Sequence, residues 1–528
     1  MYGIPITPLG HLAHVLFPLP VVAVLLWFVG RRTDPNAPWR TRIDLGLALV
    51  CGASVMLVNA FWMSRYYVQQ YPLTASDFGQ YCECIGVLRE GHLTGFVKQR
   101  AVVAGLLPSV FARGLGIVDG LLAGALASHV VLGAGIFLWA RAAHSRMAGV
   151  VATLLTGSLA PLVHLTRTVT FYPETVAGCV LSAATALLAL RYKSLPAVII
   201  AAICASTVLL MDVRGLLWGL PAVGLTSTAA LLCRGWWRPL VGLGALAGCL
   251  MGSYEIGGRV TWEQSPSLEQ QTVYYVDEAL RRFSPDDPNS GLTTGVDNAG
   301  SRFVWGRSNL EEIPKTLRFL WTLRSDLPEG IEDQPETAYG RRVHVLPWIA
   351  PGFAGLLLAV WAARRRKWVW MGLLGSLVPF IVALQGSANL VAHPRYMANG
   401  ITMVPVLLGL GFAALFLGPL SKTDHPEHRP TFAKSDWIAM ALVVFMVLGA
   451  IPSWLSPVST WRAPVSSDIE PANTLWYAAS GSNLPPDVSP RCIEFLRQDL
   501  DNGKTAGSTL LNWTVSRPPS HAPTLEGG

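Results

Sequence analysis

The chain alternates between apolar runs of membrane-spanning length and short connections that carry Lys and Arg. A helix needs about 20 apolar residues to cross the hydrocarbon core of a bilayer, and most of the runs reach that length. Of the 528 residues, 51% are hydrophobic and only 14% are charged, and the mean hydropathy is +0.40. One water-soluble core cannot bury so much apolar sequence under so few charges. The pattern predicts an all-α polytopic membrane protein.

The apolar runs predict a bundle of about twelve transmembrane helices. The first run is followed by Arg31 and Arg32 instead of a small-residue cleavage site, so we expect a retained helix and not a secretory signal. The predicted helices lie near residues 12 to 30, 43 to 63, 117 to 140, 147 to 165, 174 to 190, 195 to 211, 215 to 233, 239 to 256, 346 to 363, 368 to 385, 400 to 420 and 437 to 455.

The basic residues predict which side of the membrane each connection faces. Six alternate short connections together hold 17 Lys and Arg residues, whereas the short loops on the other side hold one Arg each. The positive-inside rule makes the Arg-rich connections cytoplasmic, among them 364 to 367, and it makes Asp77 extracytoplasmic. The net charge of +7 then belongs to loops that face anionic lipid, which argues against nucleic acid as a partner.

This topology divides the chain into five parts. The outer loop of the membrane core predicts one or two interfacial helices over 95 to 116. The C-terminal tail is rich in Pro and Ser and has helical periodicity only over 491 to 500, so it predicts a loosely packed appendage. The parts are an extra N-terminal helix with its cytoplasmic loop (1–42), the membrane core (43–256) with its outer loop (64–116), an extracytoplasmic loop (257–345), the C-terminal membrane helices (346–455) and an extracytoplasmic tail (456–528).

Three of the eight cysteines fall in predicted extracytoplasmic segments: Cys82, Cys84 and Cys492. Disulfides persist in oxidising compartments, so we expect Cys492 to be bridged to Cys82 or to Cys84, and the sequence does not choose between them. The other five cysteines lie in or at the ends of predicted membrane helices, where Cys behaves as a small hydrophobe. A C-x-C pair with no nearby His is weak evidence for a metal site.

Ionisable residues gather at the outer ends of the predicted helices, where they are costly unless they are paired or functional. Asp77 stands between two membrane segments in a loop that runs from Tyr71 to Gly95. If this loop is helical, Tyr81 lies on the same face as Asp77. Glu83, six positions after Asp77, is rotated from it by about 240°. Asp212 and Arg214 could equally form a local ion pair that turns the chain between two helices.

Three short motifs resemble the GT-C glycosyltransferases, the membrane enzymes that use polyprenyl-phosphate sugars and are related to protein mannosyltransferases and the lipid A aminoarabinose transferase. SDFGQYCECIGVLREG is similar to their first outer loop, TFYPETVAG to their second, and HPRYMANGITMVP to their late R-Y element. The order and sidedness of the motifs carry the resemblance, which extends over about residues 43 to 420. This chain departs from the family in its extra N-terminal helix and in lacking the D-x-D or D-E pair of some members.

The resemblance implies a GT-C-like bundle in the cell membrane that moves a sugar from a polyprenyl-phosphate donor to an extracytoplasmic glycan, lipid or protein acceptor. It requires no cofactor and leaves the use of a divalent metal open. Asp77 would be the general base and Glu174 a second carboxylate, since an acceptor hydroxyl loses its proton as it attacks. Arg395 would hold the donor phosphate in a bidentate manner. Supporting roles fall to Arg214 and Tyr396 at the phosphate and to Tyr81, Tyr172 and His393 at the substrate.

A polytopic transporter or lipid flippase is the competing interpretation. Such proteins also have about twelve spans with scattered polar groups, but they are built from repeated halves with helices broken at midplane. This chain instead concentrates its ionisable residues at one face and has an asymmetric loop of 89 residues over 257 to 345. The transferase is therefore the preferred interpretation.

Overall fold

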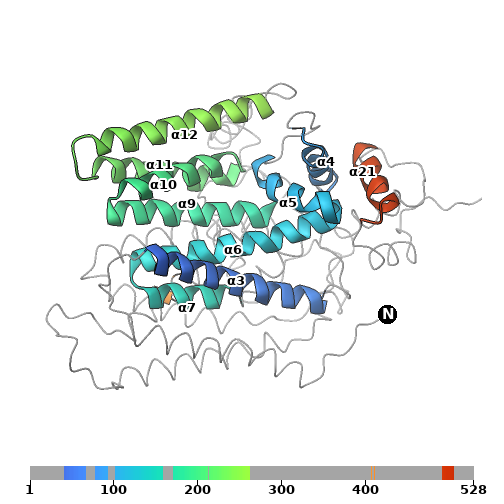
Figure 1. The fold of residues 1–528 in the computed structure, drawn as a ribbon, viewed down its shortest axis with the longest axis horizontal. Coiled ribbons are helices and arrows are strands. Elements are labelled where there is room, and N and C mark those ends of the chain that lie inside the picture. Colours follow the sequence, from blue (N-terminus) through green and yellow to red (C-terminus); the bar gives the residue numbers. More distant parts are fainter. Residues whose placement is uncertain are drawn as a thin grey trace, which may run out of the picture.

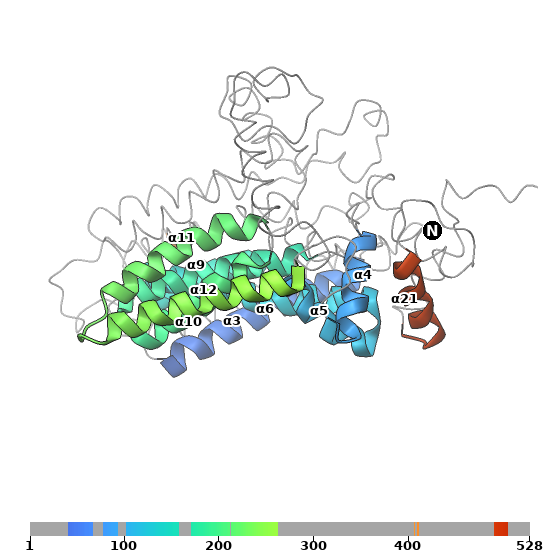
Figure 2. The same ribbon diagram turned by 90° about the horizontal axis from the view of Figure 1, so that it is seen from above.

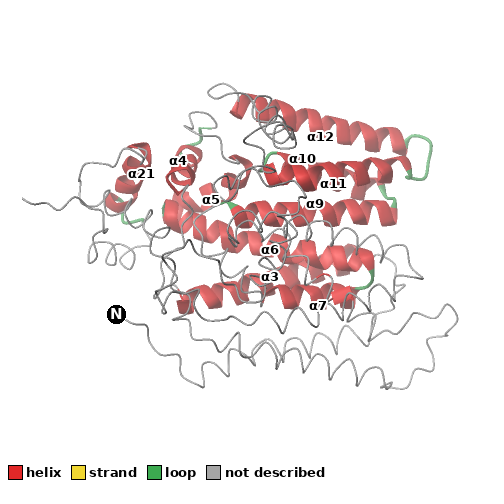
Figure 3. Ribbon diagram, turned by 180° about the vertical axis from the view of Figure 1, so that it is seen from behind, coloured by secondary structure: helices red, strands yellow, loops and turns green. Residues whose placement is uncertain are grey.

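The computed structural model describes residues 41–66, 78–92, 102–157, 171–211, 213–261, 406, 409–410 and 490–504. Helices joined by turns and short loops make up this part of the chain, and it contains no strand (Figure 3). The helices are α3 (Thr41–Tyr66), α4 (Phe78–Arg89), α5 (Val102–Leu115), α6 (Ile117–Ala143), α7 (Arg146–Gly157), α9 (Tyr172–Tyr192), α10 (Leu195–Leu209), α11 (Val213–Leu231), α12 (Arg238–Thr261) and α21 (Pro490–Asp501).

The long helices lie side by side around α6 and α9, which pack against each other (Figure 1). α6 also contacts α3, α5 and α7, and α9 also contacts α10 and α11, while α12 packs outside α10 and α11. The shorter helices α4 and α5 and the C-terminal helix α21 gather at one end of this bundle (Figures 1 and 2). The turns between α6 and α7 and between α11 and α12 lie at the opposite end (Figure 1).

Seven of the predicted membrane helices correspond to α3, α6, α7 and α9 to α12. Among the described residues, three helices are long and apolar enough to cross a membrane: Ile117–Ala143, Tyr172–Tyr192 and Arg238–Ile256. α5 and α21 correspond to the shorter helices predicted over 95 to 116 and 491 to 500. The helix predicted at 12 to 30 and those predicted from 346 onwards lie outside the described residues, apart from the helical positions 406, 409 and 410.

Small side chains let the helices of this bundle approach closely. Ala186 of α9, Ala205 of α10 and Ala222 of α11 form one buried cluster. Between α3 and α6, a Cβ placed on Gly133 would lie 2.9 Å from the Cα of Gly52 and 2.9 Å from a methyl carbon of Val55. Small residues at helix contacts are typical of membrane proteins, where close packing takes over from the hydrophobic effect as the force between helices.

α12 displays apolar side chains on its outer surface. In the span Arg238–Ile256 only 11% of the residues are buried, and Leu240 and Met251 are 67% and 64% exposed. A soluble protein rarely exposes so large an apolar face. The surface therefore fits a lipid environment.

An ion-pair cluster closes the end of the bundle at the turn between α6 and α7. Asp44 near the start of α3 is fully buried and accepts hydrogen bonds from the Nε atoms of Arg141, at 3.1 Å, and Arg146, at 2.7 Å. Removing one partner of a buried pair typically costs about 3–5 kcal/mol. Two of the 17 charges from which sidedness is predicted therefore also hold helices together.

The C-terminal helix α21 is docked, so the predicted loose packing of the tail is wrong for this segment. Cys492 and Leu496 are completely buried, and Asp499 is 1% exposed. Asp499 forms an ion pair with Arg89 at the end of α4 and accepts a hydrogen bond from the Ile117 N–H at the start of α6, at 2.7 Å. Helix N-termini leave N–H groups unsatisfied, so this carboxylate caps α6 from 382 residues away in the sequence.

Candidate active site

Glu174 lies in the first turn of α9, at the end of the bundle that carries α4 and α5. Pro173 occupies the start of the helix, where its missing N–H costs no hydrogen bond. The side chain of Glu174 points into the protein and is only 4% exposed. An acidic residue near a helix N-terminus interacts favourably with the helix dipole. This interaction does not require the side chain to be buried.

The carboxylate of Glu174 has no partner from the rest of the described chain. Neither of its oxygens accepts a hydrogen bond from another described residue. Gly124 of α6 makes room for it, since a Cβ on that glycine would lie 3.0 Å from Glu174 Oε1. Burying a carboxylate without partners is expensive. A bound proton, cation or ligand hydroxyl would offset this cost.

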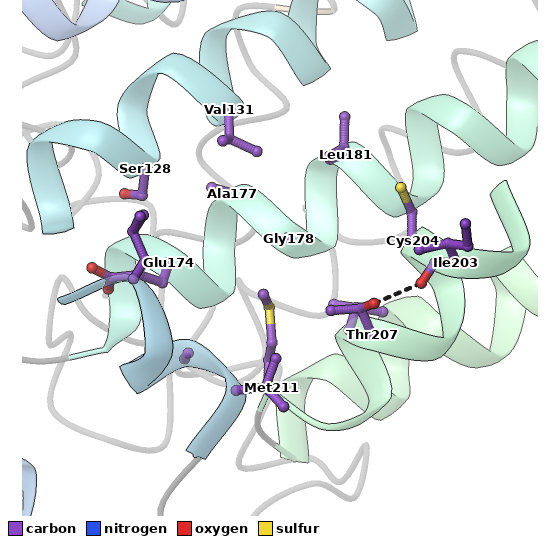
Figure 4. A pocket seen from close by; sticks show the side chains of 14 residues that line it. Ser128, Val131, Glu174, Ala177, Gly178, Leu181, Ile203, Cys204, Thr207 and Met211 are labelled. Carbon is purple, nitrogen blue, oxygen red and sulfur yellow. Dashed lines mark hydrogen bonds between the residues drawn. The ribbon is translucent and has the colours of Figure 1, made fainter. Parts of the chain in front are cut away.

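A cavity of about 180 Å³ lies beside Glu174, between α5, α6, α9 and α10 (Figure 4). Glu174 and Ser128 stand at one end of the cavity and Leu181 and Cys204 at the other. The volume is below the roughly 300–1,000 Å³ typical of sites for drug-sized ligands, so the cavity has room for a small ligand or for one segment of a larger one. Its lining residues are Val103, Ala104, Leu107, Ser128, Val131, Glu174, Ala177, Gly178, Leu181, Ile203, Cys204, Thr207, Val208 and Met211.

The other polar groups of the cavity wall are already satisfied within their own helices. Ser128 donates to the carbonyl oxygen of Ala125 at 2.7 Å, and Thr207 donates to that of Ile203, also at 2.7 Å (Figure 4). Glu174 therefore supplies the only carboxylate among the lining residues. The rest of the wall is predominantly aliphatic.

The cavity borders the outer surface of the bundle. Two of its lining residues are exposed hydrophobics, Leu107 of α5 at 37% and Ile203 of α10 at 51%. In a membrane such residues face lipid. The cavity wall is therefore partly exposed at the side of the bundle.

Aromatic contacts connect this site to α4. Tyr81 of α4 packs edge-on against Phe171, with ring centroids 4.7 Å apart, and against Tyr172, with centroids 6.4 Å apart. All three rings are at least 95% buried. Tyr172 is two residues before Glu174, and Tyr81 is four residues after Asp77, so the contact fixes the helix that follows Asp77 against the start of α9.

Of the predicted site residues, Tyr81 contacts Tyr172, and Glu174 lies in the same first turn of α9 as Tyr172. Arg214 lies in the first turn of α11, and its side chain is outside the described residues. Four further predicted site residues also lie outside the described part: Asp77, His393, Arg395 and Tyr396.

Sequence reasoning missed the cavity beside Glu174. Ser128 gives a weak signal, as a polar residue in an otherwise apolar helix. Gly124 gives none, because α6 contains several glycines whose packing roles differ. A cavity formed by four helices depends on their relative positions, which the pattern of apolar residues does not specify.

No group of three His, Cys, Asp or Glu side chains suited to a metal ion occurs in the described ranges. In the cavity lining, Glu174 could contribute an oxygen ligand. The described residues therefore do not decide whether the protein uses a divalent metal.

The comparison with protein-family models found no match, and neither did the comparison with curated proteins. Among solved structures, the chain is similar to the apo oligosaccharyltransferase of Archaeoglobus fulgidus, with 13% identity and a TM-score of 0.49 over 85% of this chain and 59% of that chain. It is also similar to ArnT from Cupriavidus metallidurans bound to undecaprenyl phosphate, with 15% identity and a TM-score of 0.47 over 89% of this chain and 88% of that chain.

This chain spans less than two thirds of the archaeal enzyme's length. Because both TM-scores are below 0.5, the matches assign neither a donor nor an acceptor.

Proposed function

We propose that this protein is a GT-C glycosyltransferase that moves a hexosyl or pentosyl unit from a polyprenyl-phosphate carrier to an acceptor on the extracytoplasmic side of the cell membrane. The proposal rests on the residues of the chain and on the sequence resemblance. Membrane lipid surrounds the bundle, and the donor enters from the bilayer.

The observation that carries the proposal is the buried carboxylate of Glu174 at the end of an apolar, laterally placed cavity. A soluble sugar substrate does not need aliphatic walls, whereas a polyprenyl chain does. An acidic residue that served only to start the helix would not need to be buried without hydrogen-bond partners. The two features together fit a lipid-linked substrate whose polar end reaches Glu174.

The chemistry follows from how charge moves during transfer. An acceptor hydroxyl attacks the anomeric carbon while the bond from that carbon to the phosphate oxygen breaks. The hydroxyl proton passes to Asp77, and negative charge grows on the leaving phosphate. Arg395 is the best candidate to stabilise this charge, because its guanidinium can hold two phosphate oxygens. Arg214 and Tyr396 would provide further contacts to the phosphate.

Glu174 has a positioning role in this scheme. A carboxylate with no hydrogen-bond donor among the described residues can accept hydrogen bonds from sugar or acceptor hydroxyl groups. Tyr81, Tyr172 and His393 provide further contacts to the substrate. The packing of Tyr81 against Tyr172 supports placing the Asp77 loop and Glu174 around one substrate.

A reconstituted transfer assay tests the proposal. Purified protein in liposomes is incubated with polyprenyl-phosphate donors that carry different hexoses or pentoses, and mass spectrometry detects released carrier and glycosylated acceptor. Transfer or hydrolysis of one donor is the expected result. Movement of intact polyprenyl-phosphate sugar between leaflets, with its glycosidic bond unbroken, would instead establish the lipid flippase.

A further inference from the structure

Cys82 of α4 and Cys492 of α21 meet in the interior of the protein. The Cys82 thiol lies 3.7 Å from the carbonyl oxygen of Cys492, and the two side chains also contact each other. Both residues are completely buried, although they are 410 positions apart in the sequence. All eight cysteines are in the thiol form in this structure.

The contact is the first of three that run along the two helices in the same order. Cys82 meets Cys492, Gly86 meets Phe495, and Arg89 pairs with Asp499. A Cβ on Gly86 would overlap the Phe495 ring, so the glycine is what lets the helices approach closely. Residues at spacings of three and four share one face of a helix. α4 and α21 therefore run parallel, with one face of each in continuous contact.

The geometry selects one of the two pairings that the sequence leaves open. Cys84 is two residues beyond Cys82, which places it about 200° further round α4. Its side chain is buried, but on a different side of the helix from the one that meets Cys492. Cys82 is therefore the cysteine of α4 that faces Cys492.

We propose that Cys82 and Cys492 form a disulfide that locks the C-terminal helix onto α4. Two S–H bonds break and one S–S bond forms. The two electrons and two protons pass to the oxidised form of a thiol–disulfide exchange protein of the extracytoplasmic compartment, which becomes a dithiol. This inference goes beyond the proposed transfer reaction and does not depend on it.

The bond forms before the two helices are fully packed. Burial raises the pKa of the Cys82 thiol well above its ordinary value, and the thiolate is the form that reacts in disulfide exchange. A docked and reduced pair would therefore react slowly. Oxidation accompanies the docking of α21 after the C-terminal segment has crossed the membrane.

The lock acts close to the candidate base. α4 begins at Phe78, directly after Asp77, and Cys82 lies in its first turns. α21 contacts the face of α4 that carries Cys82, and the neighbouring Tyr81, about 100° round the helix, contacts Tyr172. The bridge thus makes the C-terminal helix part of the framework around the Asp77 loop.

The test uses the full-length membrane protein with a protease site inserted in the predicted extracytoplasmic segment 257–345. Cells that oxidise secreted proteins are treated with N-ethylmaleimide, and the protein is cleaved and run on a denaturing gel with and without dithiothreitol. The variants are Cys82→Ala, Cys492→Ala and, as a matched control, Cys84→Ala. Peptide mapping of unreduced wild-type protein identifies the linked cysteines directly.

We expect wild type and Cys84→Ala to remain one band without reductant and to separate into two fragments with it. Cys82→Ala and Cys492→Ala should separate under both conditions. Wild-type peptides in which Cys82 and Cys492 are both alkylated would overturn the proposal. If Cys84→Ala separated into two fragments without reductant while Cys82→Ala remained one band, the Cys84–Cys492 pairing would replace the proposed one.

Discussion

Tyr81 and Tyr172 lie edge to face, with ring centroids 6.4 Å apart, and join the helix that follows Asp77 to α9, which begins at Tyr172 and carries Glu174 in its first turn. The two acids that the sequence nominates for catalysis therefore border elements that are packed together. The ring of Tyr81 makes this packing contact, so substitutions can test the ring and the hydroxyl group separately.

Tyr81→Ala should destabilise the protein much more than Tyr81→Phe. Loss of a large buried ring typically costs about 3–5 kcal/mol, whereas the Phe variant keeps both aromatic contacts. Thermal unfolding in detergent measures the difference. If Tyr81→Phe transfers sugar much more slowly at unchanged stability, the hydroxyl contacts substrate. Equal unfolding temperatures for wild type and Tyr81→Ala would contradict the packing role.

Glu174→Gln should retain or increase stability while reducing transfer by roughly 10²-fold or more. The amide replaces a buried carboxylate that has no hydrogen-bond partner among the described residues, and such a carboxylate is costly to the folded state. A residue needed only for folding would show the opposite pattern. Unfolding temperature and initial transfer rate are measured on the same preparation, with the exposed Glu90→Gln as control. A stable Gln variant with full activity would remove Glu174 from the site.

Gly86→Ala should undock α21, because the added methyl group overlaps the Phe495 ring. Hydrogen exchange at the amides of α21 should become faster while the exchange of α6 and α9 changes little. Gly114→Ala is the control, since a Cβ at Gly114 meets nothing within 4 Å. Unchanged protection of α21 in the Gly86 variant would show that the two helices are not in this contact.

Asp499 should give the docked helix a dependence on pH. Burial raises the pKa of Asp499, although the Ile117 N–H and Arg89 act in the opposite direction. The folded state therefore holds the proton more tightly than the unfolded state. Its stabilising contribution is complete below the ordinary pKa near 3.8 and is lost as pH rises through the raised value.

Asp499→Asn mimics the protonated side chain and removes this dependence. The variant should be no less stable than wild type at neutral pH, because Arg89 keeps its hydrogen bond to Gln498, at 2.9 Å. Wild type should approach or exceed the variant as the pH falls. Unfolding temperatures of both proteins across about pH 4 to 8 measure the difference. A wild-type advantage that grows with pH would contradict the assigned direction.

Apolar run length predicted most of the described helices because each run is set by the local need to cross lipid. The same information could not show that Arg141 and Arg146 are buried against Asp44, since a charge count treats every loop cation alike. Periodicity predicted a helix over 491 to 500. Its docking site could not be predicted, because the partner α4 lies about 400 residues earlier in the sequence.

The candidate site divides in the same way. Glu174, Tyr172 and Tyr81 could be nominated because polar and aromatic residues at helix ends are visible in the sequence. The cavity beside Glu174 depends on how α5, α6, α9 and α10 pack, and on the space that Gly124 leaves. Such spaces arise from tertiary packing and leave little trace in a single sequence.

Asp77→Asn in the reconstituted transfer assay tests the central claim most directly. The amide keeps the size of the side chain but cannot accept the proton of the acceptor hydroxyl. Wild type, Asp77→Asn and the control Glu90→Gln are compared at matched protein levels, with donor binding measured separately. We predict a loss of roughly 10² to 10⁴ in transfer rate with donor binding retained. Undiminished transfer by the Asn variant would contradict the assignment of Asp77 as the base.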